Sequence, residues 1–284
     1  MTGPSSAKPK IGPNVGGRFG GPGTTGDRRP RVLLAHAGPV IAGAAQRILE
    51  AHGFEVETVA DSDGVIGKLG AKLGAERGAE GEAGESCSWD ALVVDVALPG
   101  APGFELTGPA RDAGVKVVIL VASVFRRTSY KRRPRRLYGA DDYVEIHHLG
   151  DHLPNRLRAH LGLGDSQLPS ETLREVLGTL NERGDDHLRE QSAKGLATLI
   201  VADLLLYNGD RITEASSVEE ALATVAVDLD SARDLFAQVR PGPPSARQSG
   251  ESADRDLIGE AFRELVAGLG GPVKDKPTNR REES

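Results

Sequence analysis

The sequence predicts a doubly wound α/β domain over residues 31–162, built on a five-stranded parallel sheet, followed by a small α-helical bundle. Three observations indicate this arrangement. Five short apolar segments recur along residues 31–162, and amphipathic segments with helical spacing separate them. Strands buried on both faces of a parallel sheet have this continuous apolar character, and helical crossovers must connect them. After Gly164 the strand-like segments stop and only helical patterns remain.

Each element of the α/β domain follows from local pattern. In Pro39–His52, the residues Ile41, Ala45, Ile48 and Leu49 share one helical face, and Gly53 ends the helix. The five expected strands are Val32–Ala35, Phe54–Val59, Ala91–Val96, Val115–Ala122 and Asp142–Glu145. The expected helices of this domain are Pro39–His52, Ser62–Leu73, Phe104–Ala113, Lys131–Leu137 and Leu149–Leu161.

Residues 165–270 are expected to form a helical interaction or dimerisation region. Ser217 and Glu220 have the spacing of a capping box at a helix start. Leu196–Tyr207 is apolar around nearly its whole circumference, so we expect it to be buried, either in the core of the bundle or in a dimer interface. The expected helices are Pro169–Leu180, Asp186–Tyr207, Val218–Val239 with a break near Asp228–Asp230, and Arg255–Leu269.

Three further segments are too rich in Gly, Pro or charge to form a packed core. Residues 1–30 contain eight Gly and five Pro and are expected to be a disordered tail. Residues 74–88 are rich in Gly and Glu and are expected to be a flexible insertion. Residues 271–284 are expected to be a second disordered tail.

Charge and composition disfavour several classes of protein. The net charge is −6, and residues 164–284 carry 14 basic and 23 acidic residues, which makes DNA an unfavourable partner for this half. The one cysteine, Cys87, excludes a disulfide framework and favours a cytoplasmic protein. No apolar region of a signal peptide follows Met1, and the longest apolar run, 196–207, is too short to span a membrane.

Four motifs in order resemble the receiver domains of two-component response regulators. The first is the strand and loop of residues 32–39, and the second is the strand and turn of residues 90–100, which Pro102-Gly103-Phe104 follows. The third is the strand 117–122, and the fourth is Tyr138-Gly139-Ala140-Asp141-Asp142-Tyr143-Val144. The resemblance covers roughly 130 residues and implies a flavodoxin-like fold and a role in phosphorelay signal transduction.

The resemblance assigns a role to several positions of the switch. In the family, an aspartate that ends the third strand accepts the phosphoryl group, and Asp95 occupies that position. Tyr143 occupies the position of the aromatic switch residue on the fifth strand. An acidic pair that binds Mg²⁺, a Ser or Thr, and a Lys complete the family's pocket.

The remaining positions of the pocket depart from the family. His36 and Ala37 replace the acidic pair, and Ile146 stands at the Lys position with His147 after it. Val121 stands at the hydroxyl position, although Ser123 follows two residues later. Mg²⁺ prefers several oxygen ligands, so we expect no cofactor unless Asp95 is phosphorylated, and weak or absent phosphorylation.

Histidines suggest two further hypotheses. His36 is expected beside Asp95, either as an ordinary pocket histidine or as half of a pH-sensitive pair. His147, His148, His152 and His160 form a loose group, for which a surface cluster is favoured over a zinc site. No metal site is therefore predicted.

A basic cluster follows the fourth strand, where receivers dock their partners. One interpretation is a docking site for an acidic protein surface, and that surface can be the acidic C-terminal half of this chain. The alternatives are a solvated charged face and a binding site for nucleic acid or another polyanion. Its members are Arg126, Arg127, Lys131, Arg132, Arg133, Arg135 and Arg136.

These observations lead to a main hypothesis with two alternatives. The main hypothesis is a receiver-type signalling protein, not an enzyme, that works through contacts with protein partners such as a histidine kinase or scaffold, and that can form a homodimer through its helices. The first alternative is a conventional response regulator phosphorylated on Asp95. The weaker alternative is a protein that binds polyanions through the basic cluster.

Overall fold

The computed structural model describes residues 28–75, 89–124, 134–164, 166–167, 169–183, 186–240 and 256–269, without the side chains of residues 71–75 and 170. The three segments expected to lack a packed core lie almost wholly outside these ranges. Residues 1–27 of the first tail, 76–88 of the insertion and the whole of 271–284 are not described.

A single parallel sheet forms the centre of the α/β domain and confirms the predicted fold class. Its strands are β1 (Arg31–Ala35), β2 (Glu55–Val59), β3 (Ala91–Asp95), β4 (Val117–Ala122) and β5 (Asp142–Glu145). Every neighbouring pair is parallel, and the order across the sheet is β2-β1-β3-β4-β5. The order reverses direction between β1 and β3, so the carboxyl ends of these two strands form the crevice where such sheets place their sites.

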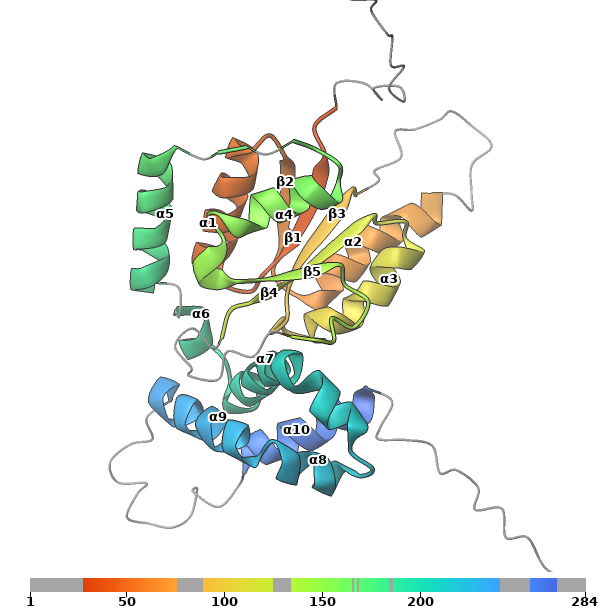
Figure 1. Ribbon diagram of the computed structural model, residues 1–284, viewed down its shortest axis with the longest axis vertical. Helices are drawn as coiled ribbons and strands as arrows, with labels where there is room; N and C mark the ends of the chain where they lie inside the picture. The colour runs from red at the N-terminus through yellow and green to blue at the C-terminus, as the bar shows by residue number, and fades with distance from the viewer. Residues whose placement is uncertain are drawn as a thin grey trace, which may run out of the picture.

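Helices cover both faces of the sheet (Figure 1). α1 (Pro39–Ala51) and α4 (His152–His160) pack on one face, and α2 (Ser62–Ala75), η1 (Gly103–Leu106) and α3 (Thr107–Asp112) pack on the other. α5 (Ser170–Arg183) lies against α1, where its Val176 and Leu180 join the same apolar core as the first face. The region 165–270 is therefore divided, because α5 packs with the α/β domain.

Two expected helices of the α/β domain differ in the structure. Residues 134–137, the described part of the expected helix Lys131–Leu137, are not helical. Pro134 lacks the N–H that a helix interior requires, and Arg135 and Arg136 place two like charges after it. The expected helix Phe104–Ala113 is divided into η1 and α3.

The remaining helices form the bundle, with α7 (Ala193–Glu214) in contact with α8 (Val218–Thr224), α9 (Ala226–Val239) and α10 (Leu257–Gly268). The expected helix Asp186–Tyr207 is divided into α6 (Asp186–Arg189) and α7, because the Ser192 side chain caps α7 by accepting from the Gly195 N–H. Ser217 caps α8 as predicted. None of the described helices is long and apolar enough to cross a membrane.

The break expected near Asp228–Asp230 lies instead at Val225, between α8 and α9. Asp228 remains inside α9, where it is buried and accepts a bond of 3.1 Å from the Arg211 guanidinium of α7. An ion pair to a neighbouring helix thus holds a poor helix former in place.

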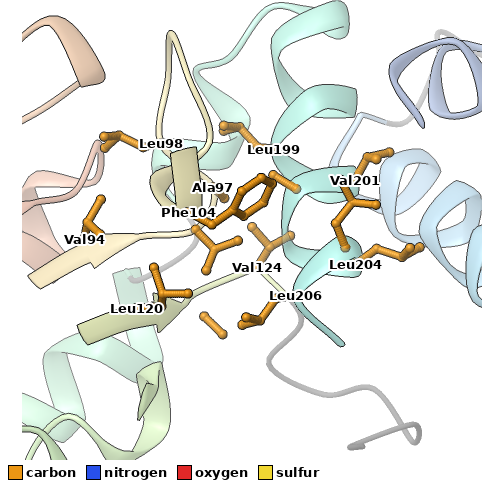
Figure 2. Close-up of a cluster of buried hydrophobic side chains, with 14 of the residues drawn as sticks. Val94, Ala97, Leu98, Phe104, Leu120, Val124, Leu199, Val201, Leu204 and Leu206 are labelled. Atoms are coloured by element: carbon orange, nitrogen blue, oxygen red, sulfur yellow. The ribbon is translucent and has the colours of Figure 1, made fainter. Parts of the chain in front are cut away.

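The bundle and the α/β domain share one apolar core (Figure 2). Figure 2 shows Leu199 and Leu206 of α7 beside side chains from the sheet and η1, including Phe104 and Val124. Leu196, Leu199, Val201 and Leu205 are at most 2% exposed within the single chain. The expected apolar helix is therefore an intramolecular core, and these side chains offer no face for a dimer interface.

Candidate functional site

Asp95 lies at the carboxyl end of β3, in the crevice that the strand order defines, and its side chain is completely buried. One carboxylate oxygen, Oδ1, accepts from the backbone N–H of Ala97 at 3.1 Å. The other, Oδ2, accepts from the Ser123 hydroxyl at 2.8 Å and lies 3.1 Å from Nε2 of His36. The predicted pocket residues Asp95, His36 and Ser123 are thus brought together.

The hydroxyl of the pocket comes from Ser123. Val121, which the sequence places at the hydroxyl position, pairs with Asp95 in the strand register but contributes only to the apolar core on the α1 face. Ser123 follows the last residue of β4, so its hydroxyl reaches the end of β3. Ile146 is buried in apolar surroundings and Ala37 is half-buried, so neither supplies charge to the site.

The ring of His36 is held in one orientation. Its Nδ1 accepts from the Gly38 backbone N–H at 2.8 Å, so the proton of the neutral ring must be on Nε2. Nε2 is the atom that faces Asp95, at 3.1 Å. The backbone N–H of His36 also donates to the carbonyl of Val59, which anchors the residue to the edge of the sheet.

A second histidine, His187 of α6, closes the pocket and was not predicted. Its ring meets that of His36 edge to face, with centroids 5.1 Å apart and planes at 68°, and it is only 3% exposed. Gly38 makes room for it, since a Cβ at position 38 would lie 2.9 Å from Cγ of His187. Nothing in the sequence signals this contact, because 149 residues separate Gly38 from His187.

The electrostatics of the pocket follow from its burial. Burial raises the pKa of the Asp95 carboxyl to about 6, against the opposing effects of the Ser123 hydroxyl, the charge of His187 and the Ala97 N–H. A carboxylate removed from water is destabilised more strongly than these three partners can offset. The pocket therefore holds a carboxyl group that accepts a proton unusually easily.

This pocket does not fit Mg²⁺. The ion requires several oxygen ligands, and the pocket offers one carboxylate, one hydroxyl and two imidazoles. His36, Asp95 and His187 are close enough to suggest a softer ion, but a metal on Nε2 of His36 would need the proton to move to Nδ1. Nδ1 already accepts the Gly38 N–H, so the ring is arranged against metal binding.

Tyr143, which the resemblance places at the position of the switch aromatic, lies half-buried against the core that α7 shares with the sheet. Its neighbour Tyr138 makes the closer connection: the ring stacks on Phe104 at 4.7 Å, and its hydroxyl donates to the backbone carbonyl of Leu205 in α7 at 3.1 Å. A Cβ at Gly209 would lie 2.5 Å from that hydroxyl, so the glycine permits the approach. The bundle thus occupies the surface beside the switch position.

Of the basic cluster, only Arg135 and Arg136 lie within the described residues. Arg135 Nε is 4.0 Å from the Asp210 carboxylate of α7, and the Arg136 guanidinium lies 5.4 Å from the centre of the Tyr138 ring. These contacts are consistent with a basic segment that faces the acidic half of the same chain. Arg126, Arg127, Lys131, Arg132 and Arg133 lie outside the described residues.

The four histidines predicted as a surface cluster lie at the β5–α4 junction and along α4. Each has a carboxylate nearby, and the shortest of these contacts joins His147 Nε2 to Glu145 Oε2 at 2.9 Å. His148 and His152 both face Asp151, while His160 faces Asp142. Their side chains are between 36% and 46% exposed, in contrast to the buried pair of the pocket.

The comparisons with known proteins concern the fold. No protein-family model and no protein of curated function matches the chain. The chain is similar to the CheY-like receiver domain protein of Methanospirillum hungatei JF-1, at 21% identity over 48% of this chain and 100% of that one, with a TM-score of 0.34.

Two other similar structures are receiver domains of histidine kinases. One is from the hybrid histidine kinase CckA, at 23% identity over 46% of this chain and 98% of that one, with a TM-score of 0.31. The other is from the kinase CKI1 of Arabidopsis thaliana, at 22% identity over 48% of this chain and 91% of that one, with a TM-score of 0.38. The matches cover about half of this chain and leave the rest unassigned.

Proposed function

We propose that this chain is a receiver-type signalling protein of the two-component kind that acts by binding other proteins, with Asp95 kept out of phosphotransfer. The position of His187 carries this proposal, because the imidazole from the C-terminal half stands over the acceptor carboxylate. The protein acts as a binding partner in the cytoplasm and not as an enzyme. Its partners are a histidine kinase or a scaffold protein.

Access to the acceptor supports this function. Phosphoryl transfer needs the acceptor oxygen in line with the leaving group of the donor. Asp95 is 0% exposed, and each of its carboxylate oxygens has a neighbour within the chain. A donor histidine would have to displace α6 and the start of α7, which the shared apolar core resists.

The charges of the pocket support it as well. A phosphoryl group adds close to two negative charges, and a metal ion and a lysine normally balance them. In this pocket, Ile146 is apolar and the donor set does not suit Mg²⁺. His36 and His187 are the nearest bases, and neither supplies a permanent positive charge.

Mass measurement after exposure to a small phosphodonor tests the proposal. The full chain is incubated with acetyl phosphate and Mg²⁺ beside an active receiver as a positive control, and we expect no adduct of one phosphoryl group. Asp95→Asn is the matched variant. An adduct on the wild type that disappears in Asp95→Asn would overturn the proposal in favour of a conventional response regulator.

That second candidate has one observation in its favour. The Ser123 hydroxyl on Asp95 retains one polar contact that the receiver resemblance associates with the phosphoryl site. Asp95 would then be phosphorylated only after His187 leaves the pocket. His187→Ala separates the two candidates, because it opens the pocket without restoring metal ligands: the proposal expects no adduct, and the second candidate expects an increased one.

A further inference from the structure

A group of histidine and carboxylate side chains lies apart from the pocket, at the turn from β5 to α4. His148 belongs to η2 (Ile146–His148), Asp151 is the N-cap of α4, and His152 is its first residue. The Asp151 carboxylate accepts from the His152 backbone N–H at 2.9 Å, which fixes it at the start of the helix. The three side chains are 42%, 58% and 46% exposed, so solvent and ions reach them.

The spacing of these groups is unusual for hydrogen bonding. His148 Nδ1 lies 3.6 Å from Asp151 Oδ1, and His152 Nε2 lies 3.8 Å from Asp151 Oδ2. Both separations exceed the usual length of an N–H···O hydrogen bond. In a tetrahedral zinc site with bonds of about 2.0 to 2.1 Å, two ligand atoms are separated by roughly 3.3 Å. The two observed separations involve different oxygens of Asp151 and exceed that value by about 0.3 and 0.5 Å. One ligand atom from each of the three residues lies within 4.8 Å of the other two, so the side chains must move closer to bind one ion.

The two imidazole rings are stacked, with centroids 4.3 Å apart and planes only 10° from parallel. A divalent cation between the rings and the carboxylate would attract one nitrogen lone pair of each ring and the carboxylate together. The rings must tilt toward each other so that both lone pairs meet at one ion, and their exposure leaves room for that rotation.

Glu145 and His147 adjoin the group, and their ligand atoms also lie within 4.8 Å of that of His148. His147 Nε2 already lies 2.9 Å from Glu145 Oε2, so this pair satisfies itself. A fourth position at His148, Asp151 and His152 remains for water, as in zinc sites with three protein ligands.

We propose that His148, Asp151 and His152 form a binding site for a first-row transition metal ion of the zinc class. Two imidazoles and one carboxylate suit Zn²⁺, Co²⁺, Ni²⁺ or Cu²⁺ and do not suit Mg²⁺. The ion joins the turn after β5 to the first turn of α4, two elements that otherwise meet through the apolar core. The site is independent of Asp95 and of phosphorylation.

Calorimetric titration of the full chain with Zn²⁺ tests the proposal. We expect saturable uptake of one ion by the wild type and none of Mg²⁺. His148→Gln and His152→Gln each remove one ligand and should weaken binding at least about 10-fold, since loss of a supporting group alone costs that much. His160→Gln is the matched control, because His160 lies on the same helix, is similarly exposed and has its own carboxylate at 3.5 Å. That control should bind as the wild type does.

Two further measurements exclude other sites in the chain. His187→Gln should leave the affinity unchanged, whereas loss of binding in this variant would assign the ion to the buried pocket and overturn the proposal. Co²⁺ should give the visible absorption of nitrogen and oxygen ligands without the thiolate band that Cys87 would produce. Absence of saturable Zn²⁺ uptake, or equal affinity in His148→Gln and the wild type, would also overturn it.

Discussion

Two of the groups of histidine and carboxylate side chains among the described residues differ in burial, and this difference separates their chemistry. In the pocket, Asp95 and His36 are at most 3% exposed, and each polar contact is made within the chain. At the β5–α4 junction, Asp151 and its two histidines are roughly half exposed, with separations longer than hydrogen bonds. The same residue types thus form buried hydrogen-bonded contacts in the Asp95 pocket and a solvent-exposed set of possible metal ligands at the β5–α4 junction.

The difference arises from what covers each group. α6 and α7 close over the carboxyl ends of β1 and β3, whereas the described helices leave the junction open to solvent. Burial of a carboxylate raises its affinity for a proton and changes its contribution to folding stability. The same burial also limits the access of a phosphoryl donor. Four predictions test this contrast, from the largest expected effect to the smallest.

The first prediction concerns the packing that keeps the pocket covered. Leu199→Ala removes a side chain that is 2% exposed in the core between α7 and the sheet. We expect the free energy of unfolding to fall by about 2–5 kcal/mol, because a cavity remains. Chemical denaturation measures the loss. Val227→Ala on α9 is the control, since Val227 is 77% exposed and its truncation should change stability by less than about 0.5 kcal/mol.

The second prediction concerns pH. The pKa of Asp95 is raised to about 6 in the folded protein, so the folded state binds the proton more tightly than the unfolded chain does. Asp95 therefore destabilises the fold as pH rises from about 4 to 6, by about 3 kcal/mol in total, because its pKa is about two higher in the folded protein than in the unfolded chain. Denaturation midpoints measured from about pH 4 to 6 should show this fall in stability in the wild type. In Asp95→Asn, the part of the pH dependence that Asp95 causes should be absent. If the wild type and Asp95→Asn lose stability identically as pH rises, the raised pKa of Asp95 is refuted.

The third prediction concerns Gly38. Its backbone φ of −81° suits any residue, so the only obstacle to a side chain is the ring of His187. Gly38→Ala should cost about 1–3 kcal/mol through overpacking, and adding His187→Ala should recover part of that loss. Gly43→Ala, inside the helix that Gly38 precedes as N-cap and with no atom within 4 Å of the new Cβ, should stabilise by up to about 1 kcal/mol.

The smallest effect on stability is expected at the exposed group of His148, Asp151 and His152. His148→Gln should change the free energy of unfolding by less than about 0.5 kcal/mol in the presence of a chelator, because His148 is 42% exposed. Thermal denaturation with the chelator present measures it. A loss of stability in His148→Gln as large as that in Gly38→Ala would contradict the contrast between the buried Asp95 pocket and the exposed group at the β5–α4 junction.

The sequence predicted the sheet well because its signal is local. Strands such as Ala91–Asp95 and Val117–Ala122 are buried on both faces, so their apolar character identifies them without knowledge of their neighbours. The helix expected at 131–137 failed in its described part because basic residues suggested a helix while Pro134 opposed one. The continuity of α9 through Asp228 is accompanied by an ion pair to Arg211 of another helix, which local pattern does not encode.

The site was predicted in part. Asp95 and His36 were placed together because the carboxyl ends of β1 and β3 must adjoin in this topology. The sequence places Ser123 only two residues beyond the expected hydroxyl position, because which residue at a strand end reaches the pocket depends on the exact strand pairing. His187 and Tyr138 remained hidden because their contacts depend on how the bundle docks, and no motif describes that.

The hydrogen bond from the Tyr138 hydroxyl to the Leu205 carbonyl lies at the interface between the α/β domain and the bundle. Both sides of this interface are apolar. A chain divided after the α/β domain would expose Phe104, Val124 and neighbouring side chains to water, and the bundle would lose the wall against which α7 packs. The two halves therefore do not behave as interchangeable modules joined by a tether. Substitutions on the outer surfaces of α8, α9 and α10 would leave this inner contact in place.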